Sequence, residues 1–276
     1  MRIARIAHAG GTAHAVLDGD TAEVIADPFG VGGAADSAAG RAPAPADGAA
    51  RRAPVRLGPR LPLGEVRLLA PVQPRTVVGM AHNTGPADRE LPPQAFLKPA
   101  RSAIGPDEPV YLPDGIGRVD AEAELAVVLA TSPAGHTPDT VLRTVYGWTV
   151  ANDLTARDLQ RNDPLWTSAK GRPGFTPLGP WIETFLDDPD DTEVTLALDG
   201  VPLRPASTRE LARSVAEILC YLGGFLPLGP GDVVLTGAPG EYGPLRPGGR
   251  AAATVAGIGT LTTPVHAGPV LAGGPR

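Results

Sequence analysis

The sequence predicts a mainly β fold with a few helices. Its 276 residues include 35 glycines and 32 prolines, and these turn-forming residues separate many short apolar stretches of strand length. Only 207–222 has a clear helical pattern, because Ser207 and Glu210 form a capping box, an apolar stripe follows, and Gly223 ends the stretch. The stripe consists of Leu211, Val215, Ile218, Leu219 and Leu222.

The first part of the chain, residues 1–71, predicts a small β region. Gly19 and Asp20 suit a tight turn between two of its strands. Three short strands are expected, at 1–8, 14–20 and 21–27.

A compositional change interrupts this region. Residues 31–59 are dominated by Ala, Gly, Pro and Arg, with no hydrophobic periodicity and no aromatic side chain. Such a segment cannot pack a core, so we predict a disordered loop there. Pro71 and Pro74 then mark a boundary. The larger domain is expected over 72–276.

The larger domain predicts further strands separated by turns. Asp199 and Gly200 favour a hairpin turn, whereas 161–184 predicts an irregular loop that could act as a lid, and 267–276 predicts a frayed end. Strands are expected at 76–80, 109–112, 119–130, 145–151 and 232–235, with two more around Gly257–Gly259.

Acidic residues punctuate two of these strands. Glu122 and Glu124 alternate with apolar residues in 119–130, so a strand places both carboxylates on one face. Like charges roughly 7 Å apart repel each other, and burying them requires a cation, a proton or a solvated face. An isolated pair of this kind usually marks a sheet edge, but the apolar run that follows argues for burial. A third acid, Asp153, stands where the strand at 145–151 gives way to a predicted helix.

Three carboxylates without a nearby Cys or His describe a site of oxygen ligands. Such a site favours Mg²⁺ or Mn²⁺, with Ca²⁺ as a weaker candidate, over zinc. Arg157 and Gln160 follow Asp153 at i+4 and i+7, so a helix projects all three from one face. A cation and an amide beside a metal suit a substrate carboxylate or carbonyl, although the Asp/Arg pair alone would suggest a helical salt bridge.

At these residues the sequence resembles the fumarylacetoacetate hydrolase family. The matching segments follow the family's order from about Val72 to Val265. The resemblance implies a mixed β-sandwich or β-roll catalytic domain after a small N-terminal region, and a homodimer. The segments are VDAEAELAVVLA, VYGWTVANDLTARDLQ, the Lys170 segment ending in PLGPW, LPLGPGDVVLTGAPG and GIGTLTTPV.

The resemblance also implies roles for individual residues. Lys170 matches the family lysine beside the metal by its place before PLGP, although the usual K-x-F-D reads KGRPGF here. A bound metal would depress the pKa of such a lysine. The implied metal ligands are Glu122, Glu124 and Asp153, and the implied substrate contacts are Arg157, Gln160, Thr236 and Gly237.

The loop after the strand at 76–80 departs from the family pattern. Relatives read G-x-N-Y-x-x-H-x-x-E, and this His/Glu pair is held to supply the general base. The present GMAHNTGPADRE is about four residues shorter before F-x-K. Aligned without a gap from Gly79, His82 stands at the tyrosine, Gly85 at the histidine and Asp88 at the glutamate. Aligned with a gap, His82 takes the histidine's place, but Gly85 then stands where the glutamate belongs. We therefore treat His82 as a hypothetical base, with Asp88 or Glu90 as possible replacements for the carboxylate.

Composition excludes several other classes of function. A net charge of −6 and a pI near 5.4 give no basic surface for nucleic acid or anionic membrane. The single cysteine, Cys220, lies in the helical pattern and is expected to be a small core residue. Without an apolar leader or an apolar stretch of about 18 residues, we expect a cytoplasmic protein.

The resemblance implies a divalent-metal-dependent hydrolase that cleaves a carbon–carbon bond through a metal-stabilised enolate. Its substrate would be a small acidic dicarbonyl of the acylpyruvate or fumarylacetoacetate type, with Lys170 as a catalytic residue. His82 is added as the hypothetical catalytic base. A decarboxylase, isomerase or lyase acting on a 2-oxo diacid is the alternative, since such enzymes need no attacking water. The altered loop also leaves open a metal-binding relative without catalysis.

Overall fold

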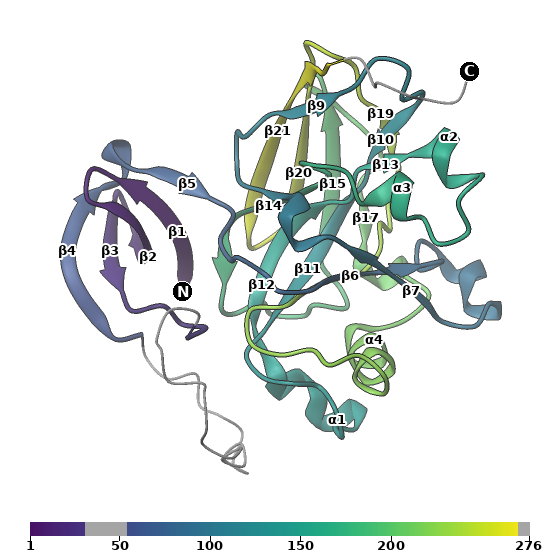
Figure 1. Ribbon diagram of the computed structural model, residues 1–276. Coiled ribbons are helices and arrows are strands. Elements are labelled where there is room, and N and C mark those ends of the chain that lie inside the picture. Colours follow the sequence, from purple (N-terminus) through teal and green to yellow (C-terminus); the bar gives the residue numbers. More distant parts are fainter. Residues whose placement is uncertain (31–53, 270–276) are drawn as a thin grey trace.

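Two β-sheets packed against each other frame the protein and confirm the mainly β prediction (Figure 1). The computed structural model describes residues 1–30 and 54–269. Along its main path the larger sheet runs β4 (Arg56–Pro62), β3 (Thr21–Ile25), β2 (Gly11–Asp18), β1 (Arg2–His8), β14 (Thr176–Glu183), β12 (Val145–Asn152), β11 (Ala123–Leu129), β18 (Val233–Leu235), β6 (Val77–Ala81) and β7 (Gln94–Lys98). Two strands flank this path, with β5 (Arg67–Leu69) on β1 and β8 (Ala103–Ile104) on β14.

The second sheet contributes the opposite wall of the core. Its main order is β16 (Val201–Pro202), β15 (Glu193–Leu198), β20 (Arg250–Val255), β21 (Gly259–Ala267) and β9 (Val110–Leu112), with β17 (Ala206–Ser207) on β15. A small third sheet consists of β13 (Thr155–Ala156), β10 (Val119–Ala121) and β19 (Gly243–Pro244).

Helical segments among the described residues are short. The α-helices are α1 (Pro138–Val141), α2 (Arg157–Gln160), α3 (Thr167–Lys170) and α4 (Val215–Gly223). The 3₁₀ turns are η1 (Leu63–Glu65), η2 (Pro86–Glu90), η3 (Ala100–Ser102), η4 (Leu142–Thr144) and η5 (Thr208–Glu210). None of these helices combines the length and the apolar character that crossing a membrane requires.

Strand β11 is buried on both faces and explains the position of the core. Leu125 and Val127 pack into the main cluster between the two large sheets, together with Val194 of β15 and Ala253 of β20. Val128 points to the other face and joins a second cluster. Because alternate residues of a strand face opposite sides, an almost wholly apolar strand fits between two layers.

The N-terminal strands form as predicted and join the larger sheet through β1. Arg2 and Ile3 of β1 pair with Glu183 and Ile182 of β14, and Figure 1 shows these strands at one side of the molecule. The predicted loop 31–59 is wrong at its end, because Arg56–Pro62 pairs with β3. Its side chains are mostly exposed, so the strand carries no apolar signal. The rest of that prediction, 31–53, lies outside the described residues.

The predicted helix at 207–222 starts too early. Ser207 and Glu210 do form a capping box, but it caps only the 3₁₀ turn η5. A second box, Ser214 with Glu217, caps α4, which ends at Gly223. Leu211 adopts an extended backbone between the two elements, so the stretch cannot be one helix.

Two other predicted elements are shorter than expected. The acidic strand breaks at Glu122, so that β10 and β11 belong to different sheets. The helix predicted from Asp153 begins only at Arg157, because the chain first forms β13. The irregular loop predicted at 161–184 is wrong in part, because the segment contains α3 and the mostly buried strand β14.

The predicted turns and remaining strands agree well with the structure. Asp199 and Gly200 both have positive φ, 54° and 83°, in the hairpin between β15 and β16. This left-handed pair is the type I′ combination that Asp-Gly favours. Of the predicted frayed end, residues 270–276 lie outside the described part.

We expect Gly79→Ala to destabilise the sheet. Gly79 pairs with Phe96 across β6 and β7, and a Cβ atom on Gly79 would lie 2.3 Å from Cζ of the ring. Moving the ring should lower the free energy of unfolding by about 1–3 kcal/mol in urea denaturation. Gly64→Ala is the control, because a Cβ atom there meets nothing within 4 Å and should change the stability by less than about 1 kcal/mol. Equal losses in both variants would contradict the steric argument.

Candidate active site

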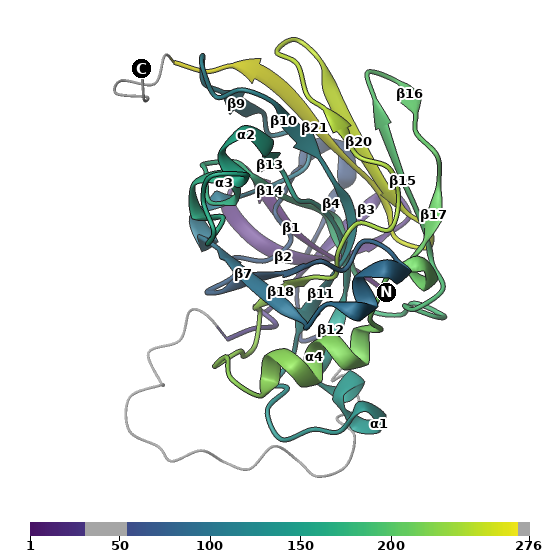
Figure 2. The same cartoon turned by 90° about the vertical axis from the view of Figure 1, so that its right-hand side faces the viewer.

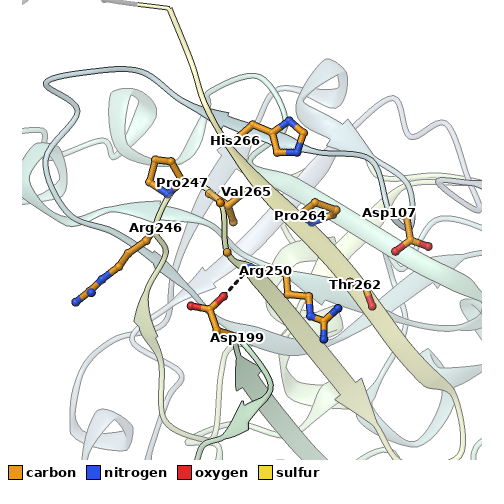
Figure 3. A pocket seen from close by; sticks show the side chains of 11 residues that line it. Asp107, Asp199, Arg246, Pro247, Arg250, Thr262, Pro264, Val265 and His266 are labelled. Carbon is orange, nitrogen blue, oxygen red and sulfur yellow. Dashed lines mark hydrogen bonds between the residues drawn. The ribbon is translucent and has the colours of Figure 1, made fainter.

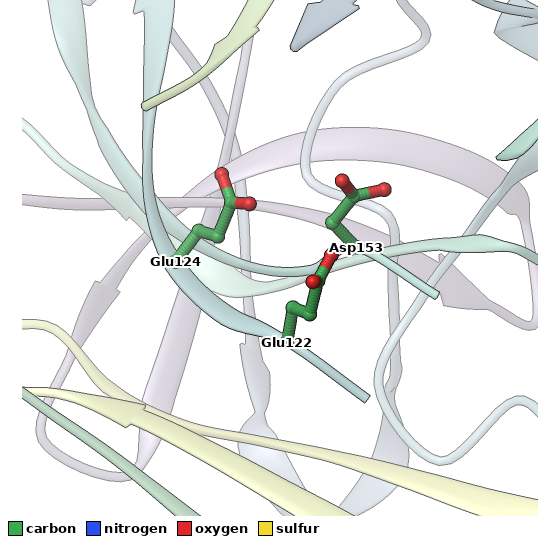
Figure 4. A group of neighbouring side chains, drawn as sticks. All are labelled: Glu122, Glu124 and Asp153. Atoms are coloured by element: carbon green, nitrogen blue, oxygen red, sulfur yellow. The ribbon is translucent and has the colours of Figure 1, made fainter. Parts of the chain in front are cut away.

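Three buried carboxylates meet where β11 and β12 run side by side. Glu122 lies between β10 and β11, Glu124 lies on β11, and Asp153 follows the last residue of β12. One oxygen of each carboxylate lies within 4.8 Å of the others, and the side chains converge in Figure 4. The predicted strand face and the predicted end of the next strand therefore supply one compact cluster.

Backbone pairing holds the acids in place. The N–H of Asp153 donates to the carbonyl of Glu122 over 2.9 Å. The N–H of Glu122 donates in turn to Oδ1 of the buried Asn152, at 3.1 Å. These bonds continue the pairing of β11 with β12 past the point where the acidic strand breaks.

Three cationic side chains surround the cluster. Nζ of Lys170 lies 3.0 Å from Oε2 of Glu122 and also pairs with Asp153. Nζ of Lys98, at the end of β7, pairs with the other oxygen of Asp153. Nη2 of Arg157 donates to Oε1 of Glu122 over 2.6 Å. The cations thus engage Glu122 and Asp153 and do not pair with Glu124.

The electrostatics differ sharply among the acids. Burial opposes the charge of Glu122, but Lys170 and Arg157 outweigh it and lower the pKa of Glu122 to about 2. Burial, followed by repulsion from Asp153 and Glu122, raises the pKa of Glu124 well above its usual value. Among the described residues Glu124 accepts one hydrogen bond, from the Gly237 N–H at 2.7 Å.

The buried charges shift the pKa values of the two lysines in opposite directions. Burial acts against the charge of Lys170, but Asp153 and Glu122 more than offset it, so the pKa of Lys170 is raised. Burial lowers the pKa of Lys98, helped by the nearby charge of Lys170 and opposed by Asp153. Lys170 also lies over the ring of Phe96, with Nζ 4.5 Å from the ring centroid.

The donor set fits a hard divalent cation. All three candidate ligands offer carboxylate oxygens, which Mg²⁺ and Mn²⁺ prefer. Glu124 supplies the physical reason, since burial raises its pKa and its ionised form is costly without a cation beside it. Glu122, Glu124 and Asp153 could therefore hold such an ion.

A cavity of about 380 Å³ opens onto the carboxylates. Its wall combines acids, cations, an amide and aromatic rings, which is the composition of a site for a small polar ligand. It is lined by Met80, Ala81, His82, Thr84, Asp88, Phe96, Glu122, Glu124, Asp153, Arg157, Gln160, Arg161, Trp166, Lys170, Gly237, Ala238 and Tyr242.

Most residues singled out from the sequence line this cavity, but Thr236 does not. The Thr236 hydroxyl donates to the carbonyl of Leu125 over 2.8 Å, and the residue is fully buried. Its neighbour Gly237 lines the cavity and presents its N–H to Glu124. A strand-end Thr-Gly pair therefore contributes here through its backbone.

Asn83 locks this strand end to the loop that carries His82. Its Nδ2 donates to the carbonyl of Thr236 over 2.7 Å, and its Oδ1 accepts the N–H of Arg213 at 2.8 Å. Gly237 has φ of 104°, and a Cβ atom there would lie 2.2 Å from the Asn83 carbonyl oxygen. Only glycine allows this close approach.

His82 lines the cavity at the start of the shortened loop. It adopts a left-handed φ of 52°, and its ring lies edge-on to Trp166, with the centroids 5.6 Å apart. Asp88 also lines the cavity, but its Oδ2 accepts both the N–H and the hydroxyl of Thr84, each at 2.9 Å. Glu90 is exposed and does not line it.

Several site residues escaped the sequence prediction. Lys98 has no local pattern that marks it, since its partner Asp153 lies 55 positions away. Asp120, which is fully buried, binds Arg157 through a 2.8 Å bond to Nε. The only available signal for Asp120 was its alternation with Glu122 and Glu124. Trp166 and Tyr242 gave no pattern at all.

A larger hollow of about 760 Å³ lies elsewhere (Figure 3) and shares no lining residue with the carboxylate cavity. It is bordered by β20, β21 and the hairpin turn, where Oδ1 of Asp199 accepts the N–H of Arg250 at 2.8 Å. Its acids, Asp107 and Asp199, do not form a cluster of potential metal ligands within the described residues. The size of a hollow therefore does not identify the chemical site.

Comparisons with known proteins agree with this geometry. A family model for the fumarylacetoacetate (FAA) hydrolase C-terminal domain matches residues 69–266, and one for an Rv2993c-like N-terminal domain matches residues 1–71. The 5-carboxymethyl-2-hydroxymuconate delta-isomerase from Mycobacterium smegmatis superposes with a TM-score of 0.84 at 35% identity, covering 97% of this chain and 100% of that chain.

Two other relatives have different activities. The maleylpyruvate hydrolase from Sphingobium sp. SYK-6, solved with manganese(II) and pyruvate, gives a TM-score of 0.75 at 26% identity, covering 97% of this chain and 100% of that one. Human mitochondrial oxaloacetate tautomerase FAHD2A is 35% identical over 207 residues, which cover 71% of this chain and 66% of that protein. The chain therefore belongs to the fumarylacetoacetate hydrolase family, in which isomerase, hydrolase and tautomerase activities occur among its relatives.

Proposed function

We propose that the protein is a divalent-metal-dependent hydrolase that cleaves a carbon–carbon bond in a small acidic dicarbonyl of the acylpyruvate or fumarylacetoacetate type. The observation that carries the proposal is the group Glu122, Glu124 and Asp153, with oxygens within 4.8 Å of one another at the floor of a polar cavity. We propose Mg²⁺ or Mn²⁺ as the cofactor, with Ca²⁺ as the weaker choice. A homodimer in the cytoplasm remains a prediction from the sequence.

The ion would act as a Lewis acid on the oxygens of a 2-oxo acid and stabilise the enolate charge. Lys170 lines the cavity and keeps its proton, so it can donate to a substrate oxygen. Gln160 accepts from Arg157 through Oε1 at 3.1 Å. That bond leaves its amide N–H groups to orient a carboxylate or carbonyl.

Arg157 then acts mainly as a positioning residue. Its Nε binds Asp120, its Nη1 binds Gln160 and its Nη2 binds Glu122. The guanidinium also stacks on Tyr242, 4.2 Å from the ring centroid. These contacts fix the candidate metal ligand Glu122 and the candidate substrate contact Gln160 relative to each other. Gly237 fixes Glu124 in the same way, and Thr236 contributes through its backbone.

Hydrolysis also needs a base for the attacking water. His82 is the cavity residue suited to this role at neutral pH. It would take a proton from water, whose oxygen adds to the carbonyl; the carbon–carbon bond then breaks, and the enolate leaving group accepts a proton. Trp166, edge-on to His82, would limit the access of other water molecules.

Isomerisation of a 2-oxo diacid is the second candidate. The usual His/Glu pair is missing from the loop, and Asp88 already binds Thr84. The superposition with the delta-isomerase covers the whole of that chain. Isomerisation and decarboxylation proceed through the same kind of enolate without an attacking water, so an assay of the products separates them from hydrolysis.

We expect Glu124→Gln to separate metal binding from folding. Without metal the variant should be at least as stable as the wild type, because Gln removes the charge that Asp153 and Glu122 repel. The rise in melting temperature on adding Mg²⁺ or Mn²⁺ should be lost, and turnover should fall at least about a hundredfold. Thermal unfolding with and without metal, followed by assays on acylpyruvates, oxaloacetate and unsaturated oxo-diacids, measures both effects.

The control is Glu65→Gln, an exposed acid far from the cluster in sequence. It should retain the response to metal and the turnover. If Glu124→Gln also keeps both, the assignment of the metal site is wrong. Metal binding without turnover of any compound in the panel would instead favour a non-catalytic relative.

We expect His82→Gln to lower kcat for acylpyruvate hydrolysis by about 10²- to 10⁴-fold, because a general base contributes a factor of this size. Metal binding should remain, since His82 makes no bond to the three carboxylates. His136→Gln, an exposed histidine outside the cavity, is the control. Unchanged hydrolysis in His82→Gln would show that another group activates the water.

A further inference from the structure

A second cavity of about 310 Å³ adjoins the carboxylate cavity. The two share Arg157, Gln160, Arg161 and Tyr242 in their walls. The second adds Arg118 and the buried Asp120. Three guanidinium groups therefore line one small space beside the proposed reaction site. Of the three acids in the proposed metal cluster, only Glu122 is bound by one of these arginines, Arg157. None of them is needed to hold Glu124 or Asp153.

The three arginines are not equally engaged. Arg157 uses Nε, Nη1 and Nη2 in bonds to Asp120, Gln160 and Glu122. It is also the least exposed of the three, with 19% of its side chain accessible. These bonds use three of its five N–H groups, so Arg157 has fewer donors left for a ligand than a guanidinium group with one bond.

Arg118 and Arg161 keep donors available. Arg118 pairs with Asp120 through Nε at 2.7 Å, and Arg161 pairs with Asp158 through Nη2. Among the described residues, neither guanidinium makes a further ion pair. Their side chains are 52% and 68% accessible. Each can therefore present two or more N–H groups to a ligand in the cavity.

The anions in this region are arranged to position the arginines. Both oxygens of Asp120 are taken, one by Arg118 and the other by Arg157. Asp158 binds the side chain of Arg161 and also accepts the backbone N–H of Arg118 at 2.9 Å. The acids thus hold Arg118 and Arg161 in the wall of the same cavity while leaving other N–H groups of each guanidinium unbound by an acid among the described residues. A planar carboxylate can accept two parallel N–H bonds from such a guanidinium group.

We propose that Arg118 and Arg161 bind a second carboxylate, at the far end of the substrate, and so determine specificity for extended 2-oxo diacids. This inference rests on the proposed function, because the first carboxylate and the 2-oxo group would lie at the metal cluster. Gln160 and Tyr242, which line both cavities, mark the passage between the two ends of the ligand. A 2-oxo acid with an apolar end would leave the arginine cavity to water.

The experiment compares ligands of equal length that differ only at the far end. Calorimetry on the Mn²⁺-loaded protein would measure 2-oxoadipate against 2-oxohexanoate, and 2-oxopimelate against 2-oxoheptanoate. The wild type should bind at least one diacid about tenfold to a hundredfold more tightly than its partner, as expected for a bond between charged groups. In Arg161→Gln and in Arg118→Gln this ratio should fall towards one.

Arg143→Gln is the matched control, since Arg143 is exposed and lines neither cavity. It should keep the wild-type ratio. Equal affinities for both members of each pair in the wild type would overturn the inference, as would a full ratio in both cavity variants. Absence of metal-dependent turnover, with the ratio intact, would sink the proposed reaction and leave the arginine site standing.

Discussion

The site depends on the mutual repulsion of three carboxylates that the fold holds together away from water. Glu122, Glu124 and Asp153 lie close enough to share one ion, and in a poorly polarisable interior their charges interact strongly. Lys98 and Lys170 arrive from distant elements, β7 and α3, and balance part of this charge. The sheet order β11–β18–β6–β7 therefore matters for electrostatics as well as for packing, because it brings Lys98 of β7 to the carboxylates.

The repulsion among the three carboxylates also explains why the surrounding cations have different roles. Lys98 pairs with Asp153 but does not line the cavity, so it serves as a fixed counter-ion within the protein. Lys170 faces the cavity and touches two of the acids, which places it between the cluster and any ligand. Arg157 holds Glu122 from the other side. Among the described cations none forms an ion pair with Glu124, which makes it the acid most in need of a bound ion.

Local patterns were enough to predict the acids and many of the strands. Glu122 and Glu124 follow from strand alternation, and Asp153 follows from its place at a strand end. Lys98 and Asp120 could not be found in this way, because their partners Asp153 and Arg157 lie 55 and 37 positions away in the chain. The early start predicted for α4 has a different cause, since two capping boxes seven residues apart give the same local signal. Only tertiary packing selects Ser214.

The bond network of Asn83 has a consequence for how the family can diversify. Asn83 joins the end of β6 to the strand end that carries Gly237, and Gly237 in turn holds Glu124. His82 lies directly before Asn83, and Nη1 of Arg213 also binds the His82 carbonyl. A change in chain length between β6 and Asn83 would therefore shift the candidate base and the candidate metal ligand Glu124 together. The two groups are coupled through one buried amide, so the loop can change its side chains here more readily than its length.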